Sequence, residues 1–150
     1  MILDLHSRRV IGWAVSNRMK RDLAIRALKM AIALRSPPRG CIFHSDRGSQ
    51  YWSHDYQKIL REHGLLASMS GKGNCYDRAM GAIGSSPMAR AAVETFFKTI
   101  KAELIWRNTW GTRRKAETAI FQYTNGFYNP RRRHSALGGK SPLAFERKVA

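Results

Sequence analysis

Asp46 is the acidic residue whose neighbours most clearly suggest chemistry in this sequence. It lies in the stretch "IFHSDRGSQY", residues 42–51, where an apolar run stops at a turn of Ser, Asp, Arg and Gly. A short apolar run bounded by turn residues is typical of a buried strand, although a buried helix segment can look similar. Because α/β proteins place binding groups at the ends of strands, Asp46 is predicted at a functional edge of a sheet.

Glu94 is the second candidate, in the helical stretch "VETFFKTIKAEL", and it also has apolar and basic neighbours. Two carboxylates brought together can bind Mg²⁺, a hard cation usually held by one or two carboxylates and the phosphates of a substrate. Two such ions about 4 Å apart activate a hydroxyl nucleophile and stabilise a leaving oxygen. The pair therefore suggests Mg²⁺-dependent chemistry on a nucleic-acid backbone, with Mn²⁺ expected to substitute.

Both acids also have an ordinary structural explanation, which is the better one for either residue taken alone. Asp46 could form an Asx hydrogen bond within its turn. Glu94, expected in the first turn of its helix, would interact favourably with the helix macrodipole. The residue types alone leave the choice open.

The charge of the chain indicates a polyanionic partner. The 150 residues include 27 Lys and Arg but 10 Asp and Glu, which gives a formal net charge of +17. Such a surface attracts nucleic acid, although charge alone fits a basic RNA-binding domain of the ribosomal type equally well. The length fits one domain. No apolar run reaches the roughly 18 residues of a membrane helix, and no signal peptide opens the chain.

Hydrophobic periodicity predicts strands alternating with helices, and hence an α/β layer. Capping and breaking residues set the boundaries. The expected elements are a hairpin broken at residues 7–9, a helix over 22–35, a strand over 41–44, a helix over 53–64, a strand over 65–70, a mobile loop over 71–90, a helix over 91–106, a second helix over 112–129 that ends before Pro130, and a short helix after Ser141 and Pro142.

Five stretches resemble, in order, successive motifs of bacterial insertion-sequence transposases with a retroviral-integrase-like catalytic core. They are "LDLHSRRVIGWAVSN", "FHSDRGSQYWS", "SMSGKGNCYDRA", "VETFFKTIKAEL" and "FYNPRRRHSALGGKSPLAFE". The resemblance covers nearly the whole chain, and five motifs in order are more specific than one short match.

The resemblance implies an RNase H-like fold in which three acids, Asp, Asp and Glu, hold two Mg²⁺ ions for DNA cleavage and strand transfer. Asp46 matches the second acid and Glu94 the third, so both are expected as catalytic metal ligands. Lys101 matches a basic residue thought to contact the element's DNA end. The remaining basic positions expected at DNA are Lys98, Arg131, Arg132, Arg133 and His134.

Two departures from the family pattern bear on activity. The segment between Asp46 and Glu94 is longer than in the family, and deleting residues 78–89 would restore the spacing, so an inserted loop is expected there. The family's first acid lies upstream of the motif that begins at Leu3. Asp4 matches a different family position and is interpreted as structural, so the first catalytic acid and the first strand are expected to be missing.

The sequence therefore predicts an N-terminally truncated RNase H-like integrase core over residues 1–129 and a basic C-terminal tail over residues 130–150. Its function would be DNA transposition, impaired in the isolated chain. The alternatives are a non-catalytic DNA-binding or regulatory transposase remnant, or a chain without a stable fold. Expected partners are DNA, a second copy or a full-length transposase, in the bacterial cytoplasm at the nucleoid and without a membrane.

Overall fold

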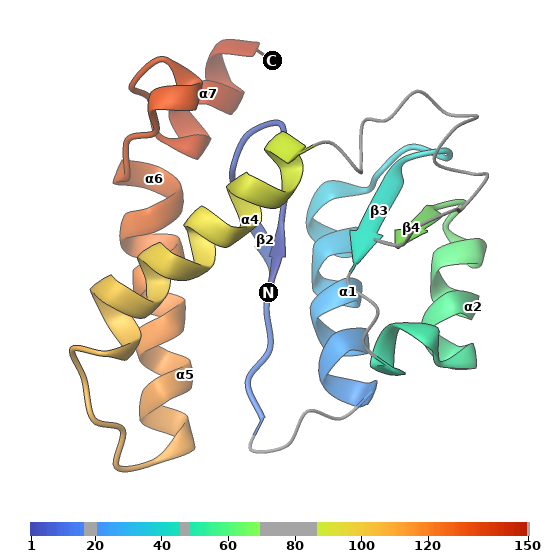
Figure 1. The fold of residues 1–150 in the computed structure, drawn as a ribbon, viewed down its shortest axis with the longest axis horizontal. Coiled ribbons are helices and arrows are strands. Elements are labelled where there is room, and N and C mark those ends of the chain that lie inside the picture. The colour runs from blue at the N-terminus through green and yellow to red at the C-terminus, as the bar shows by residue number, and fades with distance from the viewer. Residues whose placement is uncertain (17–20, 46–48, 70–86, 150) are drawn as a thin grey trace.

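The computed structural model describes residues 1–16, 21–45, 49–69 and 87–149. Short strands alternate with helices in these ranges, which confirms the α/β class (Figure 1). The elements in chain order are β1 (Ile2–Leu3), β2 (Val10–Gly12), α1 (Arg21–Arg35), β3 (Ile42–Ser45), the 3₁₀ turn η1 (Ser49–Trp52), α2 (His54–Glu62), β4 (Leu66–Met69), α4 (Pro87–Ile100), the π-helical turn η2 (Lys101–Ile105), α5 (Arg113–Phe121), the π-helical turn η3 (Gln122–Tyr128), α6 (Asn129–Arg131), the 3₁₀ turn η4 (Ser135–Leu137) and α7 (Pro142–Val149).

The predicted N-terminal hairpin is confirmed. Strands β1 and β2 pair antiparallel, with Ile2 opposite Gly12 and Leu3 opposite Val10. Helix α1 packs directly on β2. The contact is so close that a Cβ atom added at Gly12 would lie 2.2 Å from the carbonyl oxygen of Ala27. Glycine at this position therefore allows the helix to approach the strand closely.

Strands β3 and β4 form a parallel pair, in register from Ile42 opposite Leu66 to Ser45 opposite Met69. Helix α2 lies between them in the chain, and its predicted cap Ser53 accepts a hydrogen bond from the Tyr56 backbone N–H at 3.4 Å. The buried residues that join α1, α2 and the start of β4 are Leu28, Tyr56, Leu60 and Leu65.

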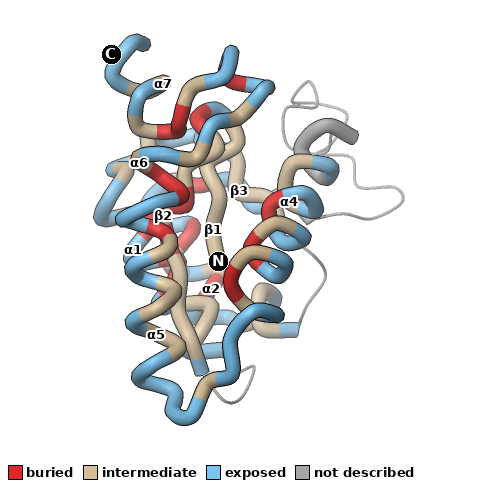
Figure 2. Tube along the Cα trace, turned by 90° about the vertical axis from the view of Figure 1, so that its left-hand side faces the viewer, coloured by how far each residue is buried: buried red, intermediate tan, exposed pale blue. Residues whose placement is uncertain are grey.

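Helices α4 and α5, extended by their π-helical turns, pack against the hairpin. Figure 1 shows α5 and α6 on one side of β2 and α1 and α2 on the other. The buried positions of α4 lie on its side turned toward the strands in Figure 2. This second core consists of Val10, Phe96, Ile100, Leu104 and Tyr128.

Two predicted helix boundaries were wrong. Helix α4 begins at Pro87 rather than residue 91, and proline is favoured at a first helical position because its missing N–H has no partner there. The helical segment that begins with α5 does not end before Pro130. It continues as η3 and α6, and the Arg132 N–H donates to the Phe127 carbonyl five residues earlier, at 3.0 Å.

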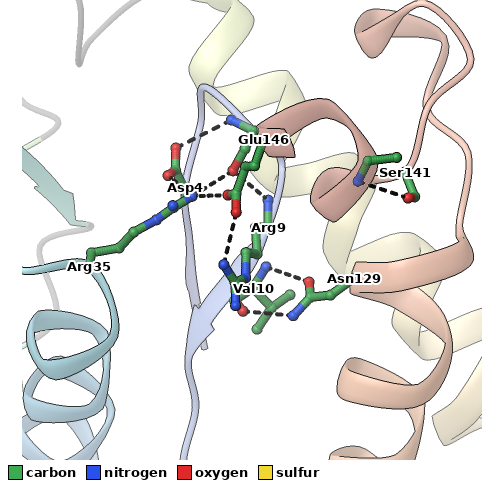
Figure 3. Close-up of polar contacts among 9 residues, drawn as sticks. Asp4, Arg9, Val10, Arg35, Asn129, Ser141 and Glu146 are labelled. Carbon is green, nitrogen blue, oxygen red and sulfur yellow. Dashed lines mark hydrogen bonds and ion pairs between the residues drawn. The ribbon is translucent and has the colours of Figure 1, made fainter. Parts of the chain in front are cut away.

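The Asn129 side chain binds the backbone of β2 as a neighbouring strand would. Its Oδ1 accepts from the Val10 N–H and its Nδ2 donates to the Val10 carbonyl, each at 3.0 Å (Figure 3). Asn129 is 2% exposed and Val10 is 3% exposed. The amide thus satisfies two buried backbone groups of β2, which among the described strands pairs only with β1.

Arg35, at the end of α1, connects the N-terminal hairpin to α7. Its guanidinium forms ion pairs with Asp4 and Glu146 and donates a 2.8 Å hydrogen bond to Ser7 Oγ (Figure 3). Arg9 forms a second ion pair with Glu146 at 2.8 Å. Burial raises the pKa of Glu146, but the Ser7 hydrogen bond and the two arginines outweigh it and hold that pKa below its usual value.

We expect Asn129→Ala to lower the free energy of unfolding by about 3 kcal/mol, because the Val10 N–H and carbonyl would be buried without partners. Asn125→Ala, at an exposed position of the same helical segment, should change it by less than about 0.5 kcal/mol. Urea unfolding of both variants measures the difference. Equal stabilities would show that the Asn129 amide does not hold β2.

Glu146 should make stability depend on acidic pH. Its folded-state pKa lies below the unfolded value of 4.5, so its contribution is complete above that pH and is lost as the pH falls through the folded pKa. Glu146→Gln should therefore show a smaller fall in Tm between about pH 5 and pH 3 than the parent chain. Glu62→Gln, at an exposed pair, is the control, and an unchanged fall in Glu146→Gln would contradict the assignment.

Candidate functional site

The segment that carries Asp46 follows β3 directly. Strand β3 ends at Ser45, as the interpretation of Asp46 as a strand-end residue requires. Asp46 itself lies outside the described residues. The neighbouring His44 lies opposite Ser68 on β4, and His44 Nδ1 is 3.4 Å from Ser68 Oγ.

Glu94 lies in the middle of α4, which corrects the expectation that it occupies the first turn. The helix begins at Pro87, so Glu94 is two turns inside it, beyond the reach of the macrodipole at the N-terminus. Phe96 and Ile100 turn toward the hairpin core, whereas Glu94 is exposed. Interaction with the helix macrodipole therefore does not explain this carboxylate.

Most acidic side chains in the described ranges have a basic partner. Ion pairs hold Asp4, Asp55, Glu62, Glu103, Glu117 and Glu146. Within the same ranges neither Asp22 nor Glu94 forms one, and Asp22 lies in the first turn of α1, where the macrodipole favours an acid. Among the side chains that the structure describes, Glu94 is thus a carboxylate without an ion-pair partner, in a strongly basic chain.

The basic residues predicted around Glu94 share its helix. Lys98 is four positions on and Lys101 seven, which places them on neighbouring turns, and both are exposed. Lys101 begins η2, where the helix changes from α- to π-type hydrogen bonding. A phosphate approaching the exposed face of α4 would meet a carboxylate and a lysine one turn apart.

The basic stretch at residues 131–134 divides into exposed and half-buried side chains. Arg131 and Arg133 are exposed. Arg132 is half-buried and forms an ion pair with Glu103 on η2, which also accepts a 2.5 Å hydrogen bond from the Tyr123 hydroxyl. Arg132 therefore ties this stretch to the end of α4, a role that sequence reasoning did not anticipate because Glu103 had not been singled out.

Glu103 in this contact and the nearby His134 both have lowered pKa values. Burial raises the pKa of Glu103, but the Tyr123 hydrogen bond and the Arg132 guanidinium outweigh it, so the pKa lies below its usual value. Burial lowers the pKa of His134, and Arg132 and Arg8 lower it further. The His134 ring lies edge-on to Tyr128, with centroids 5.3 Å apart.

Asp4 is placed as the structural interpretation expected. It pairs with Arg35 and accepts a 2.9 Å hydrogen bond from the His6 backbone N–H. In the part of the chain that the structure describes, no three His, Cys, Asp or Glu side chains form a group that could hold a metal ion. The expected inserted loop at residues 78–89 lies outside the described residues as far as residue 86, and its remainder is helical.

No helix within the described ranges is long and apolar enough to cross a membrane.

Comparison with known proteins connects both halves of the chain to one family. Models described as an integrase core domain match residues 1–75 and 94–149. The transposase InsF for insertion sequence IS3A of Escherichia coli (strain K12) is 45% identical over 148 residues, which cover 99% of this chain and 47% of that protein. The insertion element IS600 uncharacterized 31 kDa protein of Shigella sonnei is 42% identical over 147 residues, 98% of this chain and 50% of that protein.

The chain thus spans about half the length of the curated relatives it matches. The resemblance predicted from the five sequence motifs is confirmed. On these matches, the chain belongs to the integrase core domain family, among proteins similar to insertion-sequence transposases.

Proposed function

We propose that this chain is a catalytic-core segment of an insertion-sequence transposase, with an RNase H-like arrangement, in which Asp46 and Glu94 hold Mg²⁺ for cleavage and joining of DNA. The observation that carries the proposal is Glu94: its carboxylate is exposed in mid-helix, and no basic partner is described for it. Such a carboxylate repels a DNA phosphate unless a cation lies between them.

The donor chemistry of the two acids fits the metal. Carboxylate oxygens are hard ligands, and Mg²⁺ is commonly held by one or two of them while substrate phosphates and water complete its octahedron. A bound Mg²⁺ supplies Lewis acidity to the attacking and leaving oxygens. Asp46 and Glu94 would provide the negative charge that retains the metal. The family's first acid belongs to the segment that precedes Leu3 in the family pattern, so the 150 residues alone are proposed to join DNA ends poorly.

The basic residues would hold the DNA. Lys98 and Lys101 lie on the helix of Glu94 and can neutralise phosphates next to the scissile bond. Arg131 and Arg133 are exposed for backbone contacts, and Arg132 and His134 would act from half-buried positions beside them. DNA binding would be salt-dependent, because each neutralised phosphate releases counterions.

We expect Glu94→Gln to weaken binding of Mn²⁺ by at least about tenfold, because one of the two proposed ligand charges is lost. Electron paramagnetic resonance of free Mn²⁺ during titration of the chain measures the affinity. Asp22→Asn is the matched control, since Asp22 is the other described acid without an ion pair and should leave the affinity unchanged. Equal affinities for the parent chain and Glu94→Gln would exclude Glu94 as a ligand.

The same two variants test the chemistry on a labelled DNA end. Joining that requires Mn²⁺ and is abolished in Glu94→Gln but retained in Asp22→Asn would support the transposase proposal. Salt-sensitive DNA binding without metal dependence or joining in the parent chain would instead support the non-catalytic DNA-binding remnant.

The double substitution Lys98→Gln with Lys101→Gln should lower the slope of log K against log salt concentration by about 1.8 for duplex DNA, since each phosphate contact contributes about 0.9. Fluorescence anisotropy over a series of salt concentrations measures the slope. Lys58→Gln with Arg61→Gln removes the same formal charge from α2 and should change it little. An equal effect of both pairs would mean that net charge alone determines binding.

A further inference from the structure

Trp106 is the most exposed large hydrophobic side chain described, with 74% of its surface accessible. It follows η2 and begins the loop that leads to α5. Trp110, four residues later, packs against the core around Val10 and Tyr128. Two tryptophans of one short loop therefore have opposite environments, and the hydrophobic effect accounts only for the inner one.

The loop that presents Trp106 is held at both ends. The Trp106 N–H donates to the Lys101 carbonyl at 2.8 Å, and the Asn108 side chain donates to the Leu104 carbonyl at 2.8 Å. Packed Trp110 and the cap Thr112, which accepts from the Lys115 N–H at 3.3 Å, fix the other end. The indole ring is thus presented from a loop whose backbone is anchored.

Four basic residues accompany this ring, in the stretch we name the tip segment, residues 106–115. They are Arg107, Arg113, Arg114 and Lys115, and all are exposed. Arg113 pairs with Glu117 at 2.9 Å, whereas within the described ranges no ion pair holds the other three. Arg107 also helps to lower the pKa of nearby Glu103, although no ion pair joins the two. The tip segment therefore combines an exposed aromatic face with an excess of positive charge.

The placement of these charges opposes helix stability. Arg113, Arg114 and Lys115 occupy the first turn of α5, which contains no acidic residue. The macrodipole disfavours cations at this end of a helix. Residues that break a local rule without a gain in the fold are candidates for contact with a partner, and the charge requires an anionic one.

We propose that the tip segment binds single-stranded DNA, with Trp106 stacked on an unpaired base and Arg107 and Arg114 in contact with the flanking phosphates. Exposed aromatic rings next to basic side chains bind single strands in this way, because every base offers a face for stacking. The tip segment is distinct from the Asp46 and Glu94 site. It shares with the proposed function only the assumption that DNA is the partner.

The position of the tip segment fits a separate contact. It follows the end of α4 opposite Pro87, and Figure 1 shows the loop before α5 on the far side of the molecule from β3 and β4. A strand bound there would lie away from β3 and β4. Binding at the tip segment can therefore be measured without metal and without catalysis.

The test is binding of a fluorescent single strand of about 12 nucleotides and of its duplex, in EDTA, by the full chain. Trp106→Ala should weaken single-strand binding about tenfold and duplex binding much less, whereas Trp106→Phe should retain most of the affinity, because a ring remains. Since Trp106 is exposed, Tm should not change. Equal losses on both DNAs, or no loss on either, would overturn the proposal.

The charges are tested by Arg107→Gln with Arg114→Gln, which should lower the salt slope for the single strand by about 1.4, at about 0.7 for each phosphate. Lys58→Gln with Arg61→Gln, on α2 at the other end of the molecule, is the matched control and should leave the slope nearly unchanged. Identical effects of the two pairs would overturn the assigned contacts. A change in sedimentation of Trp106→Ala without a change in DNA affinity would show instead that the ring contacts a second copy.

Glu94→Gln should bind the single strand as the parent chain does. The two proposals can therefore be tested separately. If the tip-segment proposal is wrong, Trp106→Ala will not lose single-strand binding selectively. If the metal-site proposal is wrong, Glu94→Gln will keep the metal binding and DNA joining of the parent chain.

Discussion

The ion pairs of Arg35 hold together parts of the chain that are distant in sequence. Its guanidinium joins Asp4 in the hairpin, Ser7 in the turn and Glu146 in α7, while Arg9 makes a second contact with Glu146. These groups are only partly exposed, so solvent screens their attraction less than at an open surface. The C-terminal helix α7 is thereby joined to the hairpin and to α1.

Because acidic residues are scarce in this chain, these ion pairs also reduce the repulsion between its basic residues. A chain with 27 basic and 10 acidic residues repels itself, and each carboxylate placed among arginines relieves part of that repulsion. Glu103 acts in this way between Tyr123 and Arg132, as Glu146 does between Arg9 and Arg35. Glu94 on α4 departs from this pattern within the described ranges, and unlike Asp22 it does not lie in the first turn of its helix, which is why it is the proposed metal ligand.

Local features of the fold could be predicted because they depend on neighbouring residues. Ser53 and the turn at residues 7–9 marked element boundaries correctly, since capping and turn formation act over a few residues. Pro130 misled the prediction, because η3 carries the helical segment past it with bonds that span five residues. The contact of Asn129 with Val10 joins positions far apart in the chain, and no periodicity signals it.

The candidate site could be predicted as a set of residues but not as an arrangement. The motifs identified Glu94, Lys98 and Lys101, and the helical spacing brought them onto neighbouring turns. The sequence could not show which side chains of residues 131–134 are exposed and which are half-buried. The burial of Arg132 depends on Glu103 and Tyr123, which belong to two other elements. The lack of an ion pair at Glu94 among the described residues could not be foreseen either, since it depends on which basic side chains the fold brings to the other acids.

The amide of Asn129 also determines where this sheet can grow. It occupies the backbone N–H and carbonyl of Val10 on the side of β2 that faces away from β1, so no further strand can pair there at that residue. On the opposite side of the hairpin, along β1, the described contacts include no side chain that binds the backbone in this way. Within the described ranges, a further strand would therefore find open backbone groups along β1, next to Ile2 and Leu3, rather than at Val10.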